Sequence, residues 1–408
     1  MESRHRFPTP PNRRRSRLAG VSSTKRPARI CRALLIWLCS LASAASAIEP
    51  ARVPSRDEVV ETQLLPRAVK QSVQRLDSVK LDAAKPPEEP KQRIDIARRL
   101  IQAGRASGDP RTLGYAEAQL AGLPDTGPIG VEVLVLRATI EQSRHRFDSA
   151  RGLLDRAIEQ APTHVQARLT RATVGHVRGD IVAARADCEA LRTSAPPVAV
   201  ICRAIGESLS GNNAQALARL ENVTDPQLRG WALSLAGEIH EQQGAPDSAV
   251  RAYNASLALD DDLYTTVALV DALIAQQRWA QAEALLVPLP STDAVLLRRW
   301  IVARKQQRDA AALQKLLADR FAAAQVRGEF LHAREAALFA LELGDSAAAL
   351  KLARQNWNDQ REPADLRILA LAARAASDAA TLAEVSDWLA RSGLRDVRVE
   401  RALNSVKS

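Results

Sequence analysis

Few residues of this chain have the types and spacing that would hold a metal ion. A zinc site needs three or four His, Cys or carboxylate ligands, and metalloproteases place two His four residues apart on one helix beside a catalytic Glu. No His beyond residue 47 has a second His or a Cys at such a spacing; these residues are His145, His164, His176, His240 and His332. We therefore expect no metal site.

Two other segments suggest chemistry only faintly. Residues 206–211 are similar to the G-x-S-x-G turn that carries a nucleophilic Ser, but Ser210 stands where the second Gly belongs and no strand precedes the segment. The acidic run 260–262 lacks the Gly and the distal Glu of a calcium loop. No glycine-rich phosphate loop is present either. The sequence thus predicts no cofactor, no catalytic residue and no enzymatic activity.

The positive charge of the chain is concentrated at its N-terminus. The 408 residues include 57 Lys+Arg and 47 Asp+Glu, a net charge of +10. Residues 1–47 contain ten basic residues against one acidic residue, which is +9, and the remaining 47 basic and 46 acidic residues give only +1. A basic nucleic-acid-binding surface is therefore not expected on the rest of the chain, and with 3% aromatic residues a base-stacking surface is not expected either.

The N-terminal segment has the three parts of a secretory signal peptide. The basic region is followed by the apolar run 33–42 and by Ala45-Ser46-Ala47, which predicts cleavage before Ile48. We therefore expect residues 1–47 to direct export to the periplasm. The alternative is an uncleaved segment that anchors the protein in the inner membrane, but 33–47 is shorter than the roughly 20 apolar residues that a spanning helix needs.

The rest of the chain divides into three zones. Residues 48–90 are rich in Pro and charge, and we expect a lead-in or linker. From 91 to 394, apolar residues recur every three or four positions in segments that end at Gly, Asp, Asn or Pro, which predicts helices. Residues 395–408 remain as a C-terminal tail. No segment alternates with the period of two of a strand, so the predicted fold class is all-α.

A spacing of 34 residues organises the helical zone. Pro162 and Pro196 lie 34 residues apart, and each closes a helical segment. At equal offsets before the two prolines stand Ala138, Ala150, Leu154 and Ala157, and then Ala172, Ala184, Cys188 and Leu191. The pattern resembles the tetratricopeptide repeat (TPR), a pair of helices A and B with small or apolar residues at positions 8, 20, 24 and 27 and Pro at 32.

Other units follow the same template with varying strictness. The best single match begins near Gly230 and contains Gly237, Gly244, Ala249 and Tyr253. Weaker units are marked by Gly104 to Ala116, by Gly211 with Ala216, by Ala282 with Leu286, by Ala312 with Leu316, and by Ala349 with Ala353; the segment 370–394 is degenerate and is expected to cap the array. A generic Ala-rich helical bundle is the alternative, but a bundle has no need of a 34-residue period.

The resemblance implies a right-handed α-solenoid with a peptide-binding groove. In this family the A helices line the concave side, and the groove binds an extended or helical peptide. Positions 2, 5, 9 and 12 of the best-phased units project onto that side and give the candidate groove residues Gln142, Thr173, His176, Trp231, Ser234, Glu238 and Glu241, together with Glu132, Val135, Thr139, Gln166 and Leu169. The Lys and Asn set with which some members clamp a C-terminal carboxylate is missing.

Two cysteines remain after residue 47. The repeat pattern places Cys188 in helix B of one unit and Cys202 in helix A of the next. An even pair in an oxidising compartment could form a disulfide, or each Cys could be a small core residue. The repeat pattern leaves both possibilities open.

The sequence as a whole predicts a noncatalytic periplasmic TPR scaffold that binds a protein or peptide partner. It predicts neither a nucleic-acid partner nor a stable membrane span after cleavage. The alternatives are a helical accessory subunit of a cell-envelope enzyme or assembly machine, such as one acting on peptidoglycan, and a structural protein that associates with itself.

Overall fold

The computed structural model describes residues 88–109, 111–328 and 332–404. The predicted signal peptide and nearly all of the predicted lead-in lie outside the described residues.

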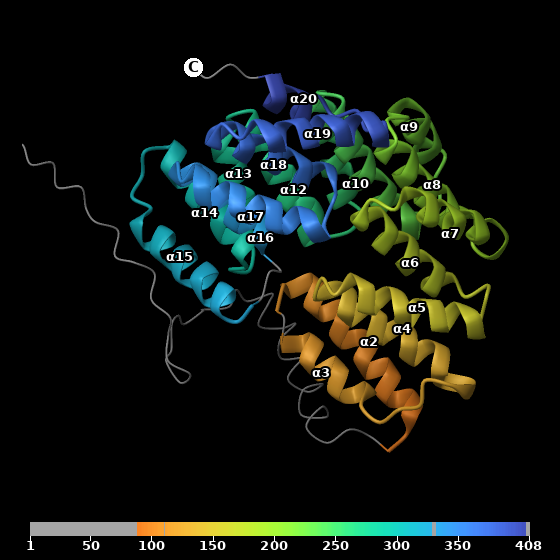
Figure 1. Ribbon diagram of the computed structural model, residues 1–408. Coiled ribbons are helices and arrows are strands. Elements are labelled where there is room, and N and C mark those ends of the chain that lie inside the picture. The colour runs from red at the N-terminus through yellow and green to blue at the C-terminus, as the bar shows by residue number, and fades with distance from the viewer. Residues whose placement is uncertain (1–87, 110, 329–331, 405–408) are drawn as a thin grey trace, which may run out of the picture. The chain divides into compact units, whose positions relative to one another are not determined.

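The described part of the chain consists of helices joined by short turns, with no strand among these residues (Figure 1). The helices are α2 (Pro90–Ser107), α3 (Arg111–Leu120), η1 (Gly127–Ile129), α4 (Gly130–Ser143), α5 (Phe147–Gln160), α6 (Val165–Arg178), α7 (Ile181–Ser194), α8 (Pro196–Leu209), α9 (Asn213–Glu221), α10 (Pro226–Gln242), α11 (Pro246–Leu257), α12 (Leu263–Ala275), α13 (Trp279–Leu286), α14 (Asp293–Lys305), α15 (Ala311–Val326), α16 (Ala333–Leu343), α17 (Ser346–Asp359), α18 (Pro363–Ala376), α19 (Ala379–Ser392) and α20 (Val397–Asn404).

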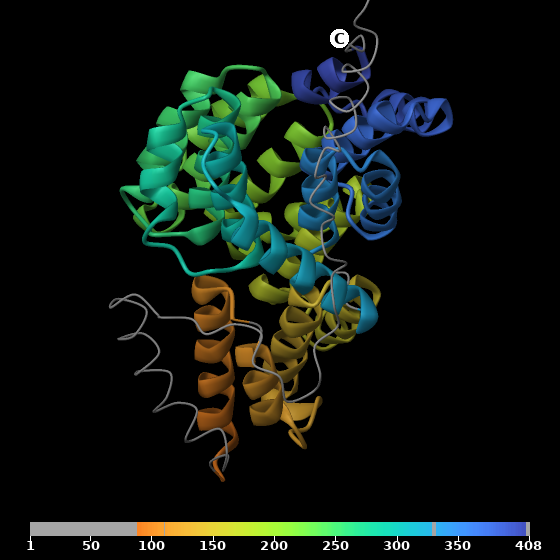
Figure 2. The ribbon, with the colours of Figure 1, turned by 90° about the vertical axis from the view of Figure 1, so that its left-hand side faces the viewer.

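Consecutive helices form pairs, and consecutive pairs stack on one another. The closest partners are sequence neighbours such as α4 with α5, α6 with α7, and α10 with α11. Each first helix also contacts the first helix of the next pair, for example α4 with α6 and α14 with α16. The two views in Figures 1 and 2 show this stacking in chain order. The fold is therefore an all-α solenoid, as the sequence predicts.

The residues of the 34-residue pattern lie where the two helices of a pair meet. Ala138, Ala150 and Leu154 have no exposed surface, and the same is true of Ala249 and Tyr253. Small side chains at the first two positions let the helices approach, and the larger residue fills the space beside them. The spacing thus reports the packing inside each pair.

Local signals fix the ends of the helices. Asp side chains accept a hydrogen bond from the backbone of the first turn at the starts of α7, α12, α17 and α19, which satisfies an otherwise unpaired N–H group. Left-handed Gly179 and Gly344 end α6 and α16, because glycine adopts a positive φ without a Cβ clash. Sharp turns of this kind keep the two helices of a pair antiparallel.

Two details differ from the sequence interpretation. In the unit of α14 and α15, Ala312 is exposed and Leu317 is fully buried, so the pattern is shifted by one residue from the predicted Ala312 and Leu316. The predicted C-terminal tail contains α20, whose Val399 and Ala402 are buried in the same apolar cluster as residues of α18. None of the helices in the described part of the chain is both long and apolar enough to cross a membrane.

Candidate interaction face

The candidate groove residues lie on the A helices, which are the first helices of the pairs. Here the term helix-A face means positions 2, 5, 9 and 12 of these helices, counted back from the small or apolar residue at position 20 of the unit. Four of the candidates do not line an open surface. Val135 and Thr139 on α4 are buried. His176 on α6 and Ser234 on α10 are buried, and the Ser234 hydroxyl is 2.8 Å from the Thr265 hydroxyl of α12. These side chains fill the contact between A helices of adjacent units, which corrects their prediction as groove residues.

Three further candidates are only partly open. Gln142 on α4 and Thr173 on α6 are half-buried, and the Thr173 hydroxyl donates to the Leu169 carbonyl oxygen of its own helix at 2.9 Å. The ring of Trp231 is half-buried and packs against the apolar cluster of α8, α9 and α10. Part of the Trp231 ring is thus already in contact with its own array and is not available to a partner.

Glu238 and Tyr264 form a polar pair on the helix-A face. The Tyr264 hydroxyl of α12 donates to Glu238 Oε1 of α10 at 3.0 Å, and Tyr264 is 57% exposed. Burial and the nearby Glu362 carboxylate raise the pKa of Glu238 to about 7, although the Tyr264 hydrogen bond opposes the shift. The negative charge of Glu238 raises the pKa of Tyr264. The pair combines an exposed aromatic ring with a carboxylate that titrates near neutrality.

Glu241 lies one turn further along α10 and has two partners. The Tyr253 hydroxyl of α11 donates to its Oε2 at 2.7 Å, and Arg398 Nη1 of α20 is 3.1 Å from its Oε1. Burial raises the pKa of Glu241, whereas Arg398 and Tyr253 oppose this shift. A predicted groove residue is thus contacted by the C-terminal helix of the same chain.

Charged pairs continue the helix-A face into the later units. Arg298 of α14 binds both carboxylate oxygens of Asp271 of α12, at 2.9 and 2.7 Å. Arg334 of α16 binds Asp365 of α18 at 2.6 and 3.0 Å and Glu362 at 2.6 Å. Arg–carboxylate forks of this kind fix geometry as well as charge, and these two tie α12 to α14 and α16 to α18.

These later residues are absent from the predicted groove residues because they belong to units outside the best-phased ones. Counting back from Ala282 puts Tyr264 at position 2 and Asp271 at position 9. Counting back from Leu313 and Ala349 puts Arg298 and Arg334 at position 5 of their units. The rule that selected Trp231 and Glu238 would therefore have found Tyr264, Asp271 and Arg334, but Arg298 follows only from the register of Leu313 and not from the predicted Ala312.

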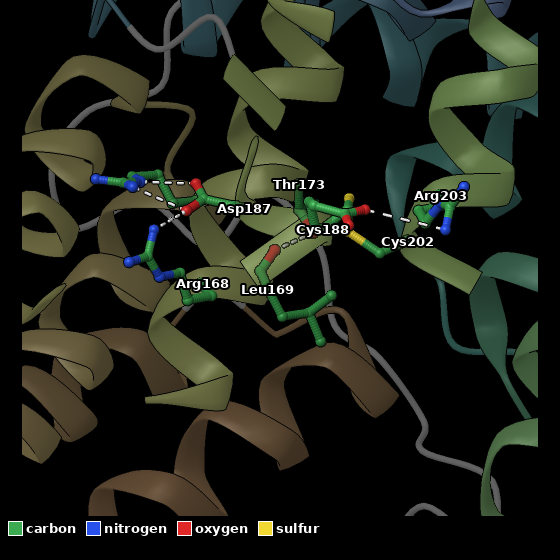
Figure 3. The surroundings of a disulfide bond; sticks show 9 residues. Arg168, Leu169, Thr173, Asp187, Cys188, Cys202 and Arg203 are labelled. Atoms are coloured by element: carbon green, nitrogen blue, oxygen red, sulfur yellow. Dashed lines mark hydrogen bonds and ion pairs between the residues drawn. A yellow bond between two sulfur atoms is a disulfide. The ribbon is translucent and has the colours of Figure 1, made fainter. Parts of the chain in front are cut away.

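A disulfide joins α7 to α8. Cys188 and Cys202 are bonded with their Cα atoms 5.4 Å apart, and both residues are buried (Figure 3). Beside them, the Asp187 carboxylate forms ion pairs with Arg168 and Arg171, each with an N–O distance of 2.7 Å. The bond therefore connects helix B of one unit to helix A of the next inside a well-ordered contact.

The helix-A face of the described chain holds no metal cluster. No group of three or more His, Cys, Asp or Glu among these residues could hold a metal ion. An open depression of about 430 Å³ lies elsewhere and is lined by Gln277, Arg278, Trp279, Ala280, Gln281 and Gln306. The lining comes from the turn between α12 and α13 and from the end of α14, and it includes none of the candidate groove residues.

Similarity to known proteins is found only at the level of solved structures. No family model and no curated protein matches the chain. Similar solved structures include PilF of Pseudomonas aeruginosa, with 14% identity, a TM-score of 0.35, and coverage of 55% of this chain and 97% of that one. Others are the Cut9–Hcn1 hetero-tetramer of the APC/C, with 15% identity, a TM-score of 0.49 and coverage of 81% and 66%, and a tetratricopeptide repeat protein from Parabacteroides merdae ATCC 43184, with 14% identity, a TM-score of 0.37 and coverage of 69% and 98%. In the pairing of its helices and the spacing of its small buried residues, the chain is an α-solenoid that resembles tetratricopeptide-repeat proteins.

Proposed function

We propose that the chain is a noncatalytic periplasmic scaffold that binds a protein or peptide through its helix-A face. The observation that carries this proposal is the pair Tyr264 and Glu238, an aromatic ring left 57% exposed beside a carboxylate on adjacent A helices. Tyrosine contributes strongly to protein interfaces because a large rigid ring also carries a polar group.

The arrangement of the face supports a protein partner rather than a small ligand. Glu238, Tyr264 and Arg334 come from three different A helices, α10, α12 and α16, whereas Arg298 of α14 is buried between them. Repeat arrays present extended surfaces of this kind, and their neighbouring units each add a few side chains to one binding face. A partner segment would therefore contact side chains of several units.

The periplasmic location is supported by the sequence of residues 1–47. A basic region, an apolar run and Ala45-Ser46-Ala47 are the pattern that export machinery recognises. Cell fractionation followed by N-terminal sequencing tests this part, with Ile48 expected as the first residue of the exported chain. A chain that retains residues 33–47 in the membrane fraction would favour the anchored alternative.

A site-specific cross-link tests the binding face. A photoreactive phenylalanine analogue placed at position 264 keeps an aromatic ring at the face, and the same analogue at Val182, an 84% exposed residue of the B helix α7, is the matched control. We expect a discrete adduct in the periplasm from position 264, reduced by Glu238→Ala, and none from position 182. Equal adducts from both positions, or an adduct insensitive to Glu238→Ala, would count against the helix-A face as the binding site.

A further inference from the structure

The C-terminal helices contact the turns of much earlier helix pairs, and we propose that these contacts form a clasp that opens and closes. The closed clasp covers Glu241, and the open clasp leaves Glu241 free for a basic side chain of the partner. This inference rests on the proposed function, because the covered residue belongs to the helix-A face. The clasp comprises residues 358–361 and 393–398 on one side and His145, residues 177–179, residues 211–213, Glu241 and Gly244 on the other.

The first half of the clasp is centred on one backbone hydrogen bond. The N–H of Arg361, after α17, donates to the carbonyl oxygen of Val177 in α6 at 2.7 Å. Beside it, Arg178 Nη1 is 2.9 Å from Asp359 Oδ1. Trp388 of α19 covers Gly179, where a Cβ would lie 2.7 Å from the ring. A few specific contacts thus join residues that lie about 180 positions apart in the sequence.

Helix α20 and the residues before it supply the second half. The Asn213 side-chain amide donates to the Arg395 carbonyl oxygen at 3.3 Å, and Arg398 reaches Glu241 at 3.1 Å. Arg398 is held for this contact by both oxygens of the fully buried Asp396, at 3.0 and 2.7 Å. The chain comes so close that a Cβ on Gly211 would lie 2.9 Å from Arg395 Cγ.

Polar contacts predominate in the clasp, and its apolar contacts are those of Trp388 with Gly179 and of Val397 with Gly244. The apolar cluster that contains the buried residues of α18 and α20 includes, within the described chain, no residue before Ile274. The ion pair Arg178–Asp359 is exposed to solvent, where such a pair contributes little free energy. The pair Arg398–Glu241 is mostly buried, and there the cost of removing both charges from water offsets much of their attraction. Contacts with few buried apolar atoms belong to the parts of a protein that open locally without global unfolding.

The clasp also indicates the chemistry of the partner. Arg398 satisfies Glu241 on the side that Tyr253 leaves open, and Glu238 lies one turn away on the same face of α10. Removal of Arg398 takes away the ion-pair partner of Glu241. A partner segment that carries an Arg or Lys side chain would replace Arg398 there, so α20 acts as an internal competitor.

Backbone amide exchange of Arg361 reports directly on opening. The opening variant is Arg178→Ala/Arg398→Gln in the full chain, which removes both ion pairs and keeps Glu241. The matched control is Arg151→Ala/Arg144→Gln, which removes the same charge from pairs with Asp180 and Glu117 that lie outside the clasp. We expect about tenfold faster exchange at Arg361 in the opening variant, unchanged exchange inside α10 and α18, and no change in the control.

A peptide in trans tests what the clasp covers. A labelled peptide of residues 393–404 is titrated against each full-length protein by fluorescence anisotropy. We expect it to bind the opening variant at least tenfold more tightly than the unaltered protein, and to lose this binding when its own Arg398 is changed to Gln or when Glu241→Gln is added to the protein.

The possible results separate the clasp from the proposed function. Unchanged exchange at Arg361, or equal loss of protection throughout the chain, would overturn the clasp. Equal peptide affinity for both proteins would overturn the competition at Glu241. An absence of cross-links from position 264 in every variant would instead count against the proposed function and would leave the exchange result standing.

Discussion

The ring of Tyr253 lies directly against Gly237, so that a Cβ at position 237 would be only 2.5 Å from Tyr253 Cδ1. The two residues hold α10 and α11 together at positions 8 and 24 of one unit, and Tyr253 is fully buried. The absence of a side chain on one helix is therefore matched by a large ring on the other. This close fit depends on glycine.

We predict that Gly237→Ala destabilises the protein. The added methyl group must push the buried Tyr253 ring or separate the two helices, and overpacking of this kind costs about 1–3 kcal/mol. Chemical denaturation followed by circular dichroism measures the change in unfolding free energy.

Gly152→Ala provides the matched control. Gly152 lies within α5, and a Cβ there would meet nothing within 4 Å. Because alanine loses less backbone entropy than glycine in a helix, this variant should gain about 0.5–1 kcal/mol. Equal effects at positions 237 and 152 would show that the contact with Tyr253 does not limit the approach of the helices.

A second prediction concerns the turns between helices of a pair. Gln277 and Gln307 have φ values of 58° and 57°, and Gly344 has 83° at the corresponding turn of its unit. A left-handed conformation costs a non-glycine residue roughly 1–2 kcal/mol. Glycine removes this strain, but it also makes the unfolded chain more flexible, which offsets part of the gain in stability. We expect Gln277→Gly and Gln307→Gly to raise the unfolding free energy by about 0.5–1 kcal/mol each.

Gly344→Ala tests the same strain in the opposite direction. A Cβ at position 344 would meet nothing within 4 Å, so any loss of stability arises from the backbone conformation alone. We expect a loss of about 1 kcal/mol in thermal or chemical denaturation. A neutral result in all three variants would mean that these turns relax to another conformation at little cost.

The regular part of the fold was predictable because each helix pair carries its own packing signal. Ala138 with Ala150, and Gly237 with Tyr253, report contacts between helices that are adjacent in sequence. Such contacts depend on local spacing, which a single sequence displays. The shift from Ala312 to Leu313 arose because three consecutive alanines, Ala310 to Ala312, precede Leu313, so that a small residue does not mark the register there.

The contacts between distant units were not predictable in this way. Whether Arg398 meets Glu241 depends on the small rotation between successive pairs, summed over four intervening units. The burial of Ser234 likewise depends on how closely α10 and α12 approach. Tyr264, in contrast, occupies the same position of its unit as Trp231, so a complete projection of the repeat would have found it.

A third prediction concerns the disulfide between Cys188 and Cys202. The bond closes a loop with a sequence separation of 14 residues, for which restriction of the unfolded chain stabilises the folded state by about 3 kcal/mol. Purified oxidised protein should therefore unfold at a clearly lower temperature after reduction. The Cys188→Ala/Cys202→Ala variant should show the lower value in both conditions.

Titration of thiols in denatured, unreduced protein decides whether the bond forms. We expect no reactive thiol from Cys188 and Cys202 before reduction and two after it. With protein of residues 48–408, which lacks Cys31 and Cys39, two reactive thiols before reduction would refute the bond. An unaltered melting temperature on reduction would show that the contact between α7 and α8 is maintained by packing alone.

The fourth prediction concerns the pH dependence of stability at Glu238. The pKa of Glu238 is about 7 in the folded protein, above the 4.5 expected for an unperturbed Glu. Between these two pH values the folded state therefore binds more protons at this residue than the unfolded state does. The contribution of Glu238 to the unfolding free energy must then fall as the pH rises from about 4.5 to 7.

Glu238→Gln isolates this effect because Gln keeps an oxygen that can accept the Tyr264 hydroxyl but does not ionise. The variant should gain stability relative to the unaltered protein as the pH rises, by roughly 2 kcal/mol between pH 5 and 8 once solvent screening is allowed for. His145 and His176, whose pKa values burial lowers to about 4, act in the opposite direction in both proteins, so the comparison cancels them. Urea denaturation of both proteins at pH 5, 6, 7 and 8 measures the difference. A difference that stays constant with pH would show that Glu238 titrates as an ordinary solvated carboxylate and that Glu362 and burial do not act on it.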